Sequence, residues 1–163
     1  LLASANYFQG LKIATLILGD TVTGESREIA KSYAALAREI RIHPQLLKAP
    51  IVLLSGGETT VTIKGNGRGG RNSEFLLSLL IELDGLKDTY ALACDTDGLD
   101  GTENNAGALI SPDSLVRARQ LGLNAASFLI NNDAYTFFEQ LNDLVITGPT
   151  YTNVNDYRAI LIL

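Results

Sequence analysis

Short apolar runs alternate with segments of helical periodicity along this chain. Runs rich in β-branched residues predict buried strands, the alternation within 60–64 predicts a half-exposed strand, and apolar residues at helical spacing predict helices. The expected strands are 11–18, 51–55, 60–64, 89–95, 108–111, 143–148 and 157–163, and the expected helices are 25–42, 72–83, 113–121, 125–130 and 133–141. Strands that alternate with helices predict an α/β fold, which we expect to be a three-layer sandwich around a mixed, mostly parallel sheet.

A break in composition near 44–50, where two prolines flank a short segment, is the best candidate for a domain boundary. The length of 163 residues is sufficient for a domain with a full hydrophobic core. We therefore divide the chain into a segment 1–45 and an α/β domain 46–163.

The charge distribution excludes more classes of function than the overall composition does. A hydrophobic content of 46% and a charged content of 19% are ordinary for a globular domain and exclude global disorder. The net charge of −5 is uneven, because residues 1–81 carry nine Lys/Arg against six Asp/Glu and residues 82–163 carry four against twelve. We therefore expect no uniformly basic surface for nucleic acid, and instead a cationic and an acidic loop facing one cleft.

Three features of the sequence bear on location. The single cysteine, Cys94, leaves no partner for an internal disulfide, which agrees with a reducing cytoplasm. No apolar run is long enough for a transmembrane helix, and residues 1–10 lack the basic and apolar regions of a signal peptide. The chain has no methionine, which suggests a fragment or a processed product. We expect a cytoplasmic protein without a membrane partner.

The strongest chemical signal is the segment 55–72, SGGETTVTIKGNGRGGRN. It holds six glycines, and its last nine residues include three cations but no acid. Dense glycine lets a backbone approach a ligand closely, and the N-terminus of the helix that follows would attract an anion. We therefore expect this segment to bind an anion, with phosphate favoured. The candidate residues are Gly56, Gly57, Lys64, Gly65, Gly67, Arg68, Gly69, Gly70, Arg71 and Asn72.

Two other interpretations of this segment remain open. Gly65, Gly67 and Gly70 form the G-x-G-x-x-G pattern of dinucleotide-binding proteins. The amphipathic strand before them and the two arginines among them weaken that interpretation. Asp95 lies 25 residues past Gly70, a tolerable but loose spacing for the acidic residue that holds a ribose. The segment could also be a tight hairpin and loop with solvated arginines.

An acidic loop follows the expected strand 89–95. It places Asp95, Asp97, Asp100 and Glu103 within nine residues, a density at which carboxylates repel one another unless cations lie among them. The spacing does not match an EF-hand, whereas Mg²⁺ needs only one or two carboxylates with substrate phosphates. We expect Asp95 and Asp97 to bind the metal, the alternative being an Asp/Gly turn that caps its own backbone amides.

The remaining polar groups give weaker signals. The loop 147–156 could orient a small polar ligand or be a solvated turn. His43 is expected beside a helix end, and Cys94 is expected to be an inert thiol in a buried strand. One histidine and one cysteine are too few for a zinc site built from those residues.

Four stretches together resemble the C-terminal domain of the bacterial and animal glycerate 2-kinase family, the MOFRL domain. They are SGGETTVTIKGNGRGGRNSEF, ACDTDGLDGTENNAGA, NNDAYTFF and DLVITGPTYTNVNDYRAILI. Members of that family are often called hydroxypyruvate reductases. The resemblance covers about 19–163 and implies transfer of the ATP γ-phosphoryl group to the 2-hydroxyl of D-glycerate, giving 2-phosphoglycerate, with Mg²⁺.

The resemblance also implies roles for particular residues and for the rest of the protein. Arg71 matches the family's site arginine and would be catalytic, and Asp95 and Asp97 match its DTDG loop. A larger N-terminal domain with a catalytic lysine would share the cleft with this chain, and 1–45 would be the tail of that domain or a linking strand–helix segment. This chain alone would then be inactive or nearly so.

Three matters stay open after the resemblance. The reaction could be an NAD(P)H-dependent reduction of hydroxypyruvate, or the chain could be a docking or regulatory module without chemistry of its own. Homo-oligomerisation is also open.

Overall fold

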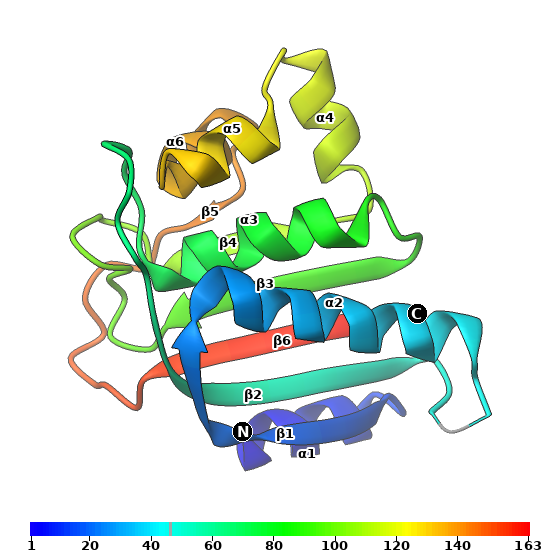
Figure 1. Cartoon of the computed structure of the whole chain (residues 1–163). Helices are drawn as coiled ribbons and strands as arrows, with labels where there is room; N and C mark the ends of the chain where they lie inside the picture. Colours follow the sequence, from blue (N-terminus) through cyan, green and yellow to red (C-terminus); the bar gives the residue numbers. More distant parts are fainter. Residues whose placement is uncertain (46) are drawn as a thin grey trace.

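The computed structural model describes residues 1–45 and 47–163 and confirms an α/β fold (Figure 1). The helices are α1 (Leu2–Gly10), α2 (Ser26–Ile42), α3 (Arg71–Leu83), α4 (Ser114–Gln120), α5 (Ala125–Ile130) and α6 (Ala134–Leu141). The strands are β1 (Ala14–Glu25), β2 (Ile51–Thr60), β3 (Thr89–Asp95), β4 (Gly107–Ile110), β5 (Leu144–Val145) and β6 (Asp156–Ile162). No helix within these described residues is long and apolar enough to cross a membrane.

The six strands form one mixed sheet in the order β1-β2-β6-β3-β4-β5. The expectation that it would be mostly parallel is wrong, because only β1 and β2 pair in parallel and the other neighbouring pairs are antiparallel. The connection through α2 returns the chain to the same end of the sheet and gives the parallel pair. In contrast, β4 follows β3 through a loop without a helix, and β6 inserts between β2 and β3 in the opposite direction.

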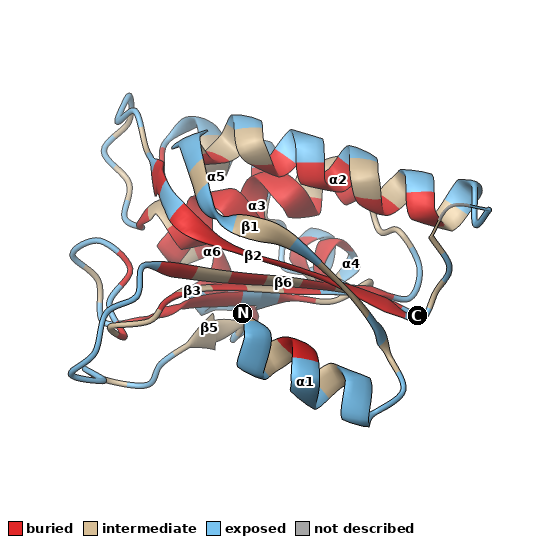
Figure 2. Ribbon diagram, turned by 90° about the horizontal axis from the view of Figure 1, so that it is seen from below, coloured by how far each residue is buried: buried red, intermediate tan, exposed pale blue. Residues whose placement is uncertain are grey.

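The helices divide unevenly between the two faces of the sheet. The five helices α2–α6 cover one face, and α1 lies on the other (Figure 2). The main core lies under α3, whose Phe75, Leu76, Leu77 and Leu79 have no exposed surface. A smaller cluster joins Ala5 of α1 to β2. The expected three layers are therefore present, but one outer layer consists of a single short helix.

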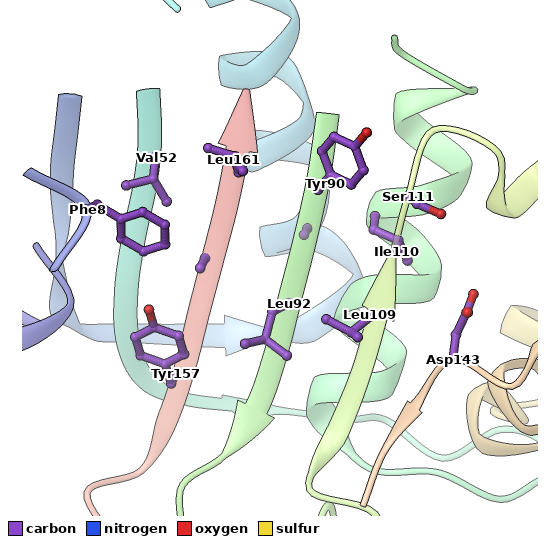
Figure 3. A pocket seen from close by; sticks show the side chains of 12 residues that line it. Phe8, Val52, Tyr90, Leu92, Leu109, Ile110, Ser111, Asp143, Tyr157 and Leu161 are labelled. Atoms are coloured by element: carbon purple, nitrogen blue, oxygen red, sulfur yellow. The ribbon is translucent and has the colours of Figure 1, made fainter. Parts of the chain in front are cut away.

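The face opposite the five helices carries an apolar groove of about 370 Å³ (Figure 3). Phe8, Leu92, Leu109, Tyr157 and Leu161 are among its lining residues. Antiparallel sheets that face water usually carry polar side chains on that face. This face is therefore more apolar than a hydrated sheet surface normally is.

The segment 1–45 supplies β1 and α2 to the same sheet and core as the rest of the chain. The predicted boundary at 44–50 includes residue 46, which lies outside the described residues. The helix α1 was not expected from the sequence.

The strands differ most from expectation at glycines. β1 continues past Gly19-Asp20 and β2 continues past Gly56-Gly57, where the sequence predicted that these strands end. The register between the two strands shifts between Ile17 and Val22. Gly19 and Gly57 have φ values of +119° and +114°, which glycine adopts without strain. The expected strand 60–64 is wrong, because the chain leaves the sheet at Thr60 and continues as a loop.

Candidate functional site: an arginine held by two aspartates

Several chain segments distant in sequence meet at one edge of the sheet, drawn at the left in Figure 1. The carboxyl ends of β2 and β3 lie beside the start of β6 there, because Ser55 pairs with Arg158 and Asp95 pairs with Asp156. The N-terminus of α3 and the loops 61–70, 96–106 and 146–155 surround this edge. Ligand sites of α/β proteins commonly form where strands end in this way.

Arg71, the first residue of α3, lies at the centre of this edge. Its Nε donates to Asp156 Oδ1 at 2.7 Å, and its Nη2 donates to Asp95 Oδ2 at 2.5 Å. Its Nη1 lies 3.6 Å from Glu58 Oε1, which is longer than a hydrogen bond. The guanidinium is thus fixed on two sides by neighbouring strands, while its side chain keeps 24% exposure and remains accessible.

Burial and the neighbouring charges together set the pKa values of Arg71 and Asp95. Burial acts to lower the pKa of Arg71, but the hydrogen bond to Asp156 and the nearby negative charges outweigh it and raise the pKa above the ordinary arginine value. Burial raises the pKa of Asp95, against the effects of the Asp97 N–H and the Arg71 charge. Arg71 therefore stays charged throughout the physiological pH range.

Asp156 connects Arg71 to the interior. It is buried, and its Oδ1 also accepts from Asn72 Nδ2 at 2.8 Å, while its Oδ2 accepts from Arg158 Nη2 at 2.5 Å. Of the candidates predicted from the sequence, the structure brings Arg71, Asn72 and Asp95 together around this residue.

The N-terminus of α3, where we expected an anion, holds a carboxylate of the chain itself. The N–H groups of Asn72 and Ser73 donate to Asp100 at 2.9 and 2.8 Å, and the Ser73 hydroxyl donates at 2.5 Å. Burial raises the pKa of Asp100, although these three donors act in the opposite direction. A Cβ on Gly70 would lie 2.3 Å from Asp100 Oδ1, so this contact accounts for the glycine.

The glycines of the loop 61–70 are explained by contact with the segment 131–133. A Cβ on Gly65 would lie 2.2 Å from the Asn131 carbonyl oxygen, and one on Gly67 would lie 2.3 Å from Asp133 Cβ. The N–H groups of Lys64 and Gly65 donate to Asn132 Oδ1 at 2.8 and 3.0 Å. The glycine-rich loop therefore approaches another segment of the protein closely, where the sequence predicted a close approach to a ligand.

The other glycines differ in their distance from the centre. Gly57 packs against the backbone of Val22, and Gly69 lies beside the backbone of Tyr135. Gly56 borders the centre itself. It lines a pocket of about 150 Å³ together with Leu1, Asp20, Thr96, Val154, Asp156 and Tyr157.

The structure separates the three cations of the glycine-rich segment. Arg68 donates to Glu103 at 2.6 Å, and its guanidinium carbon lies 4.1 Å from the centre of the Tyr135 ring. It thereby joins two loops, and more than half of its side chain is exposed. Lys64 is exposed on the loop. Arg71 is thus the cation of this segment that the buried aspartates hold.

Asp95 and Asp97 lie two residues apart, but all four of their carboxylate oxygens already have hydrogen-bond partners. Asp97 Oδ1 accepts from the Leu99 N–H at 2.9 Å, and its Oδ2 accepts from Asn153 Nδ2 at 3.1 Å. Within residues 1–45 and 47–163 there is no group of three or more His, Cys, Asp or Glu side chains placed to hold a metal ion. The donor set fits only a cation that also takes oxygens from a ligand, as Mg²⁺ does with phosphates.

The two residues given no catalytic role stay outside the centre. His43 lies exposed at the end of α2, where its Nδ1 is 2.7 Å from Glu39 Oε1. Cys94 is partly buried in β3, and burial raises the pKa of its thiol to about 11.

Asp156, Arg158, Glu58 and Asp100 were missed as site residues. Arg158 gave a usable signal, because it is the one charged residue within the apolar run YRAILIL at the end of the chain. A charge inside a strand that is otherwise apolar is rarely buried without a partner. Asp156, two residues before it on the same face of β6, was the candidate partner.

The fold and this edge define an α/β domain with an arginine–aspartate centre where its strands end. The sequence profile of the MOFRL family matches residues 51–156, and the chain belongs to this family.

Individual relatives carry two different names. A protein of Agrobacterium vitis with the provisional name of a hydroxypyruvate reductase is 53% identical over 152 residues, which cover 92% of this chain and 40% of that protein. The D-glycerate 2-kinase of Thermotoga maritima is 38% identical over 147 residues, covering 90% of this chain and 35% of the enzyme. This chain therefore spans less than half the length of either relative.

A solved structure shares the fold. The crystal structure of a glycerate kinase from Thermotoga maritima matches with a TM-score of 0.93 and 35% identity. The match covers 97% of this chain and 38% of that chain.

Proposed function

We propose that this chain is the C-terminal portion of a glycerate 2-kinase, which transfers the γ-phosphoryl group of ATP to the 2-hydroxyl of D-glycerate. The names of the Thermotoga maritima relatives support the reaction. The observation that carries the proposal within this chain is the accessible guanidinium of Arg71, held by Asp95 and Asp156. Phosphoryl transfer depends mainly on positioning and on neutralisation of charge, and a fixed guanidinium supplies both.

In this mechanism Arg71 binds an oxygen of the transferring phosphoryl group through Nη1. Its Nε and Nη2 are already bonded to Asp156 and Asp95, so the group does not need to be ordered when the substrate arrives. The Glu58 carboxylate lies near Nη1, and because its side chain is exposed it can move aside as the phosphate binds.

Asp97, with Asp95, would hold Mg²⁺ together with phosphate oxygens of ATP. Bound there, the ion would offset the negative charge of the phosphates. Asp97 is the better placed of the two, because its oxygens accept only from a backbone amide and a neutral side-chain amide, whereas Asp95 binds Arg71.

The larger N-terminal domain, with its catalytic lysine, is the partner that completes the cleft in this proposal, and the chain alone is therefore inactive or nearly so.

We propose that this remaining part of the protein covers the apolar groove on the face opposite the five helices. The chain spans 40% and 35% of two relatives, so more than half of such a protein lies outside it. An exposed apolar groove of this size on a sheet face is typical of a contact surface.

The name of the Agrobacterium vitis relative favours a second candidate, the reduction of hydroxypyruvate. That reaction would use the Gly65–Gly70 loop to bind a dinucleotide. The glycines of that loop approach the segment 131–133 and Asp100, which speaks against it.

The test uses the full-length protein that contains this chain, assayed with ATP, Mg²⁺ and D-glycerate. We expect the wild type to form 2-phosphoglycerate and Arg71→Ala to lose roughly 10²- to 10⁴-fold in turnover, because a charge contact to the transition state is removed. Arg119→Ala is the matched control, since Arg119 lies exposed on α4 and its ion pair is with Asp84, away from the site. Turnover of Arg71→Ala equal to that of the control would remove Arg71 from the mechanism.

A further inference from the structure

Arg158 is an arginine enclosed completely by the core. Its side chain has no exposed surface, and it lies on β6 between Ser55 of β2 and Ala93 of β3. Charged side chains are rarely buried to this extent, because removal of their hydration is costly unless partners compensate. Its presence at the centre of the sheet therefore requires an explanation.

The partners of Arg158 come from three elements. Its Nη2 donates to Asp156 Oδ2 at 2.5 Å and to Thr59 Oγ1 at 2.9 Å. The Thr59 hydroxyl also accepts from Ser26 at the start of α2, at 2.7 Å. The guanidinium carbon lies 5.1 Å from the centre of the Phe75 ring of α3. These contacts fix the guanidinium and aim one edge of it at Asp156.

The two oxygens of Asp156 face different groups. Oδ2 faces Arg158 in the interior, and Oδ1 faces Arg71 and Asn72 at the site. An Asp carboxylate otherwise rotates broadly about its last torsion. Both oxygens are bonded, and Oδ2 also accepts a longer bond from the Thr59 N–H at 3.4 Å. The bond from Arg158 is the charged and shorter of the two on Oδ2, so it contributes most on that side to directing Oδ1 toward Arg71 Nε.

The order of residues along β6 distinguishes this arrangement from ordinary core packing. Ile162 and Ile160 share the inward face of β6 with Arg158 and Asp156, because side chains two residues apart point the same way. The two isoleucines fill the main core. The polar residues of this face begin only where the strand approaches Arg71.

We propose that Arg158 is a positioning residue for Arg71, acting through Asp156. Arg158 holds the Asp156 carboxylate in one orientation, and the carboxylate in turn holds the Arg71 guanidinium toward the cleft. The proposal has two parts. The geometric part is that Arg158 orders Arg71, and it concerns this chain alone. The catalytic part is that this ordering speeds the reaction, and it rests on the proposed kinase function.

The geometric part is tested by the Arg71 Nε–H signal in ¹H–¹⁵N spectra of this chain, assigned from its loss in Arg71→Lys. In the wild type we expect slow exchange of this proton with water, because it is bonded to Asp156. Arg158→Met, which keeps the length and removes the donors, should speed the exchange at least about tenfold, as expected for a lost hydrogen bond. Arg117→Met is the control, because Arg117 of α4 also pairs with an aspartate, Asp143, and lies outside the site.

The catalytic part is tested in the full-length enzyme. We expect Arg158→Met to lower kcat roughly 10- to 100-fold with KM changed little, as when an orienting partner is lost. Arg158→Lys should recover part of that loss, and it also serves if the methionine variant does not fold. Arg117→Met should lower thermal stability and leave kcat unchanged.

The outcomes separate the two proposals. A folded Arg158→Met or Arg158→Lys variant with wild-type Arg71 exchange and wild-type kcat would overturn the positioning role. A wild-type enzyme that forms no phosphoglycerate would overturn the proposed function, and the exchange measurement would still decide whether Arg158 orders Arg71.

Discussion

Arg68 and Arg71 lie three residues apart in one glycine-rich segment, yet they have different surroundings. Arg71 bonds to two buried aspartates, whereas Arg68 lies against Tyr135 and Glu103 with much of its side chain in solvent. Exposed ion pairs like that of Arg68 contribute little to stability, and their side chains remain adaptable. The surroundings therefore select Arg71 as the fixed cation of the site.

Cys94 provides a test of burial beside the site. Burial, with a smaller effect from the nearby charges of Asp95 and Asp156, raises the pKa of its thiol to about 11. Folding raises this pKa, so the protonated thiol adds to the free energy of unfolding. This contribution is fully present below the pKa that the thiol has in the unfolded chain, and it is lost as the pH rises toward 11. In metal-free buffer, the alkylation rate of the folded chain should increase about tenfold per pH unit until it levels off near pH 11.

The control for Cys94 is the same reaction in denaturant, where the rate should level off at about pH 8.5 to 9. Mass spectrometry of the alkylated chain gives both rates. A folded chain whose rate levels off near pH 9 would show that the thiol is not buried as described.

The residues that matter at the site were only partly predictable. Arg71, Asn72 and Asp95 stand in motifs that carry charge or glycine, so the sequence drew attention to them. Asp156 lies 85 residues beyond Arg71 along the chain, and only the pairing of β6 with β3 brings the two together. Such long-range pairing leaves no local pattern in a sequence.

At the scale of elements, local patterns located most helices and strands. The helix α3 and the strand β3 were predicted to within a residue or two, because an amphipathic or apolar pattern ends there at a clear signal. The helix α1 was missed because it buries only Ala5 and has no apolar stripe. The segment 60–64 was predicted as a strand from its alternation, but Glu25 and Asn132 hold it as a loop through hydrogen bonds to its backbone amides.

The glycine-rich loop can be tested by a pair of substitutions. Gly65→Ala places a Cβ against the Asn131 carbonyl and should lower the free energy of unfolding by about 1–3 kcal/mol, as overpacking does. Gly10→Ala at the end of α1 meets nothing within 4 Å and should leave it unchanged or raise it by up to about 1 kcal/mol. Urea unfolding of this chain measures both.

Equal stability of the two glycine variants would mean that the loop does not lie against 131–133. The glycines would then again be available to approach a ligand. The interpretation of Gly65–Gly70 as a dinucleotide loop would gain support from that result.

At the scale of the whole molecule, the sequence predicted the class of fold but not the direction of its strands. Alternating strands and helices indicated an α/β domain, and the structure has one. The insertion of the last strand, β6, between β2 and β3 makes two neighbouring pairs antiparallel, and the pairs β3–β4 and β4–β5 are antiparallel as well. The same insertion assembles the site, because it carries Asp156 and Arg158 to the edge where Arg71 lies.

The apolar groove predicts different behaviour for this chain and for the full-length protein. We expect the chain alone to bind an apolar fluorescent dye such as anilinonaphthalene sulfonate, and the full-length protein to bind less of it if, as we propose, the rest of the protein covers the groove. Leu109→Thr, in a half-exposed position on β4, should reduce dye binding by the chain. Ile130→Thr on α5 is the control, since Ile130 is exposed on the opposite side.

Gel filtration of the same samples identifies the occupant. A monomeric chain with strong dye binding supports coverage by the rest of the protein. A stable dimer that Leu109→Thr dissociates would instead assign the groove to a second copy of the chain.

We propose above all that the edge around Arg71 serves phosphoryl transfer. The most direct measurement supplies the full-length protein in parallel with ATP, Mg²⁺ and D-glycerate, and with NADH and hydroxypyruvate. We expect formation of 2-phosphoglycerate without oxidation of NADH. Oxidation of NADH without turnover of ATP would contradict it and would assign the glycine-rich loop to a dinucleotide.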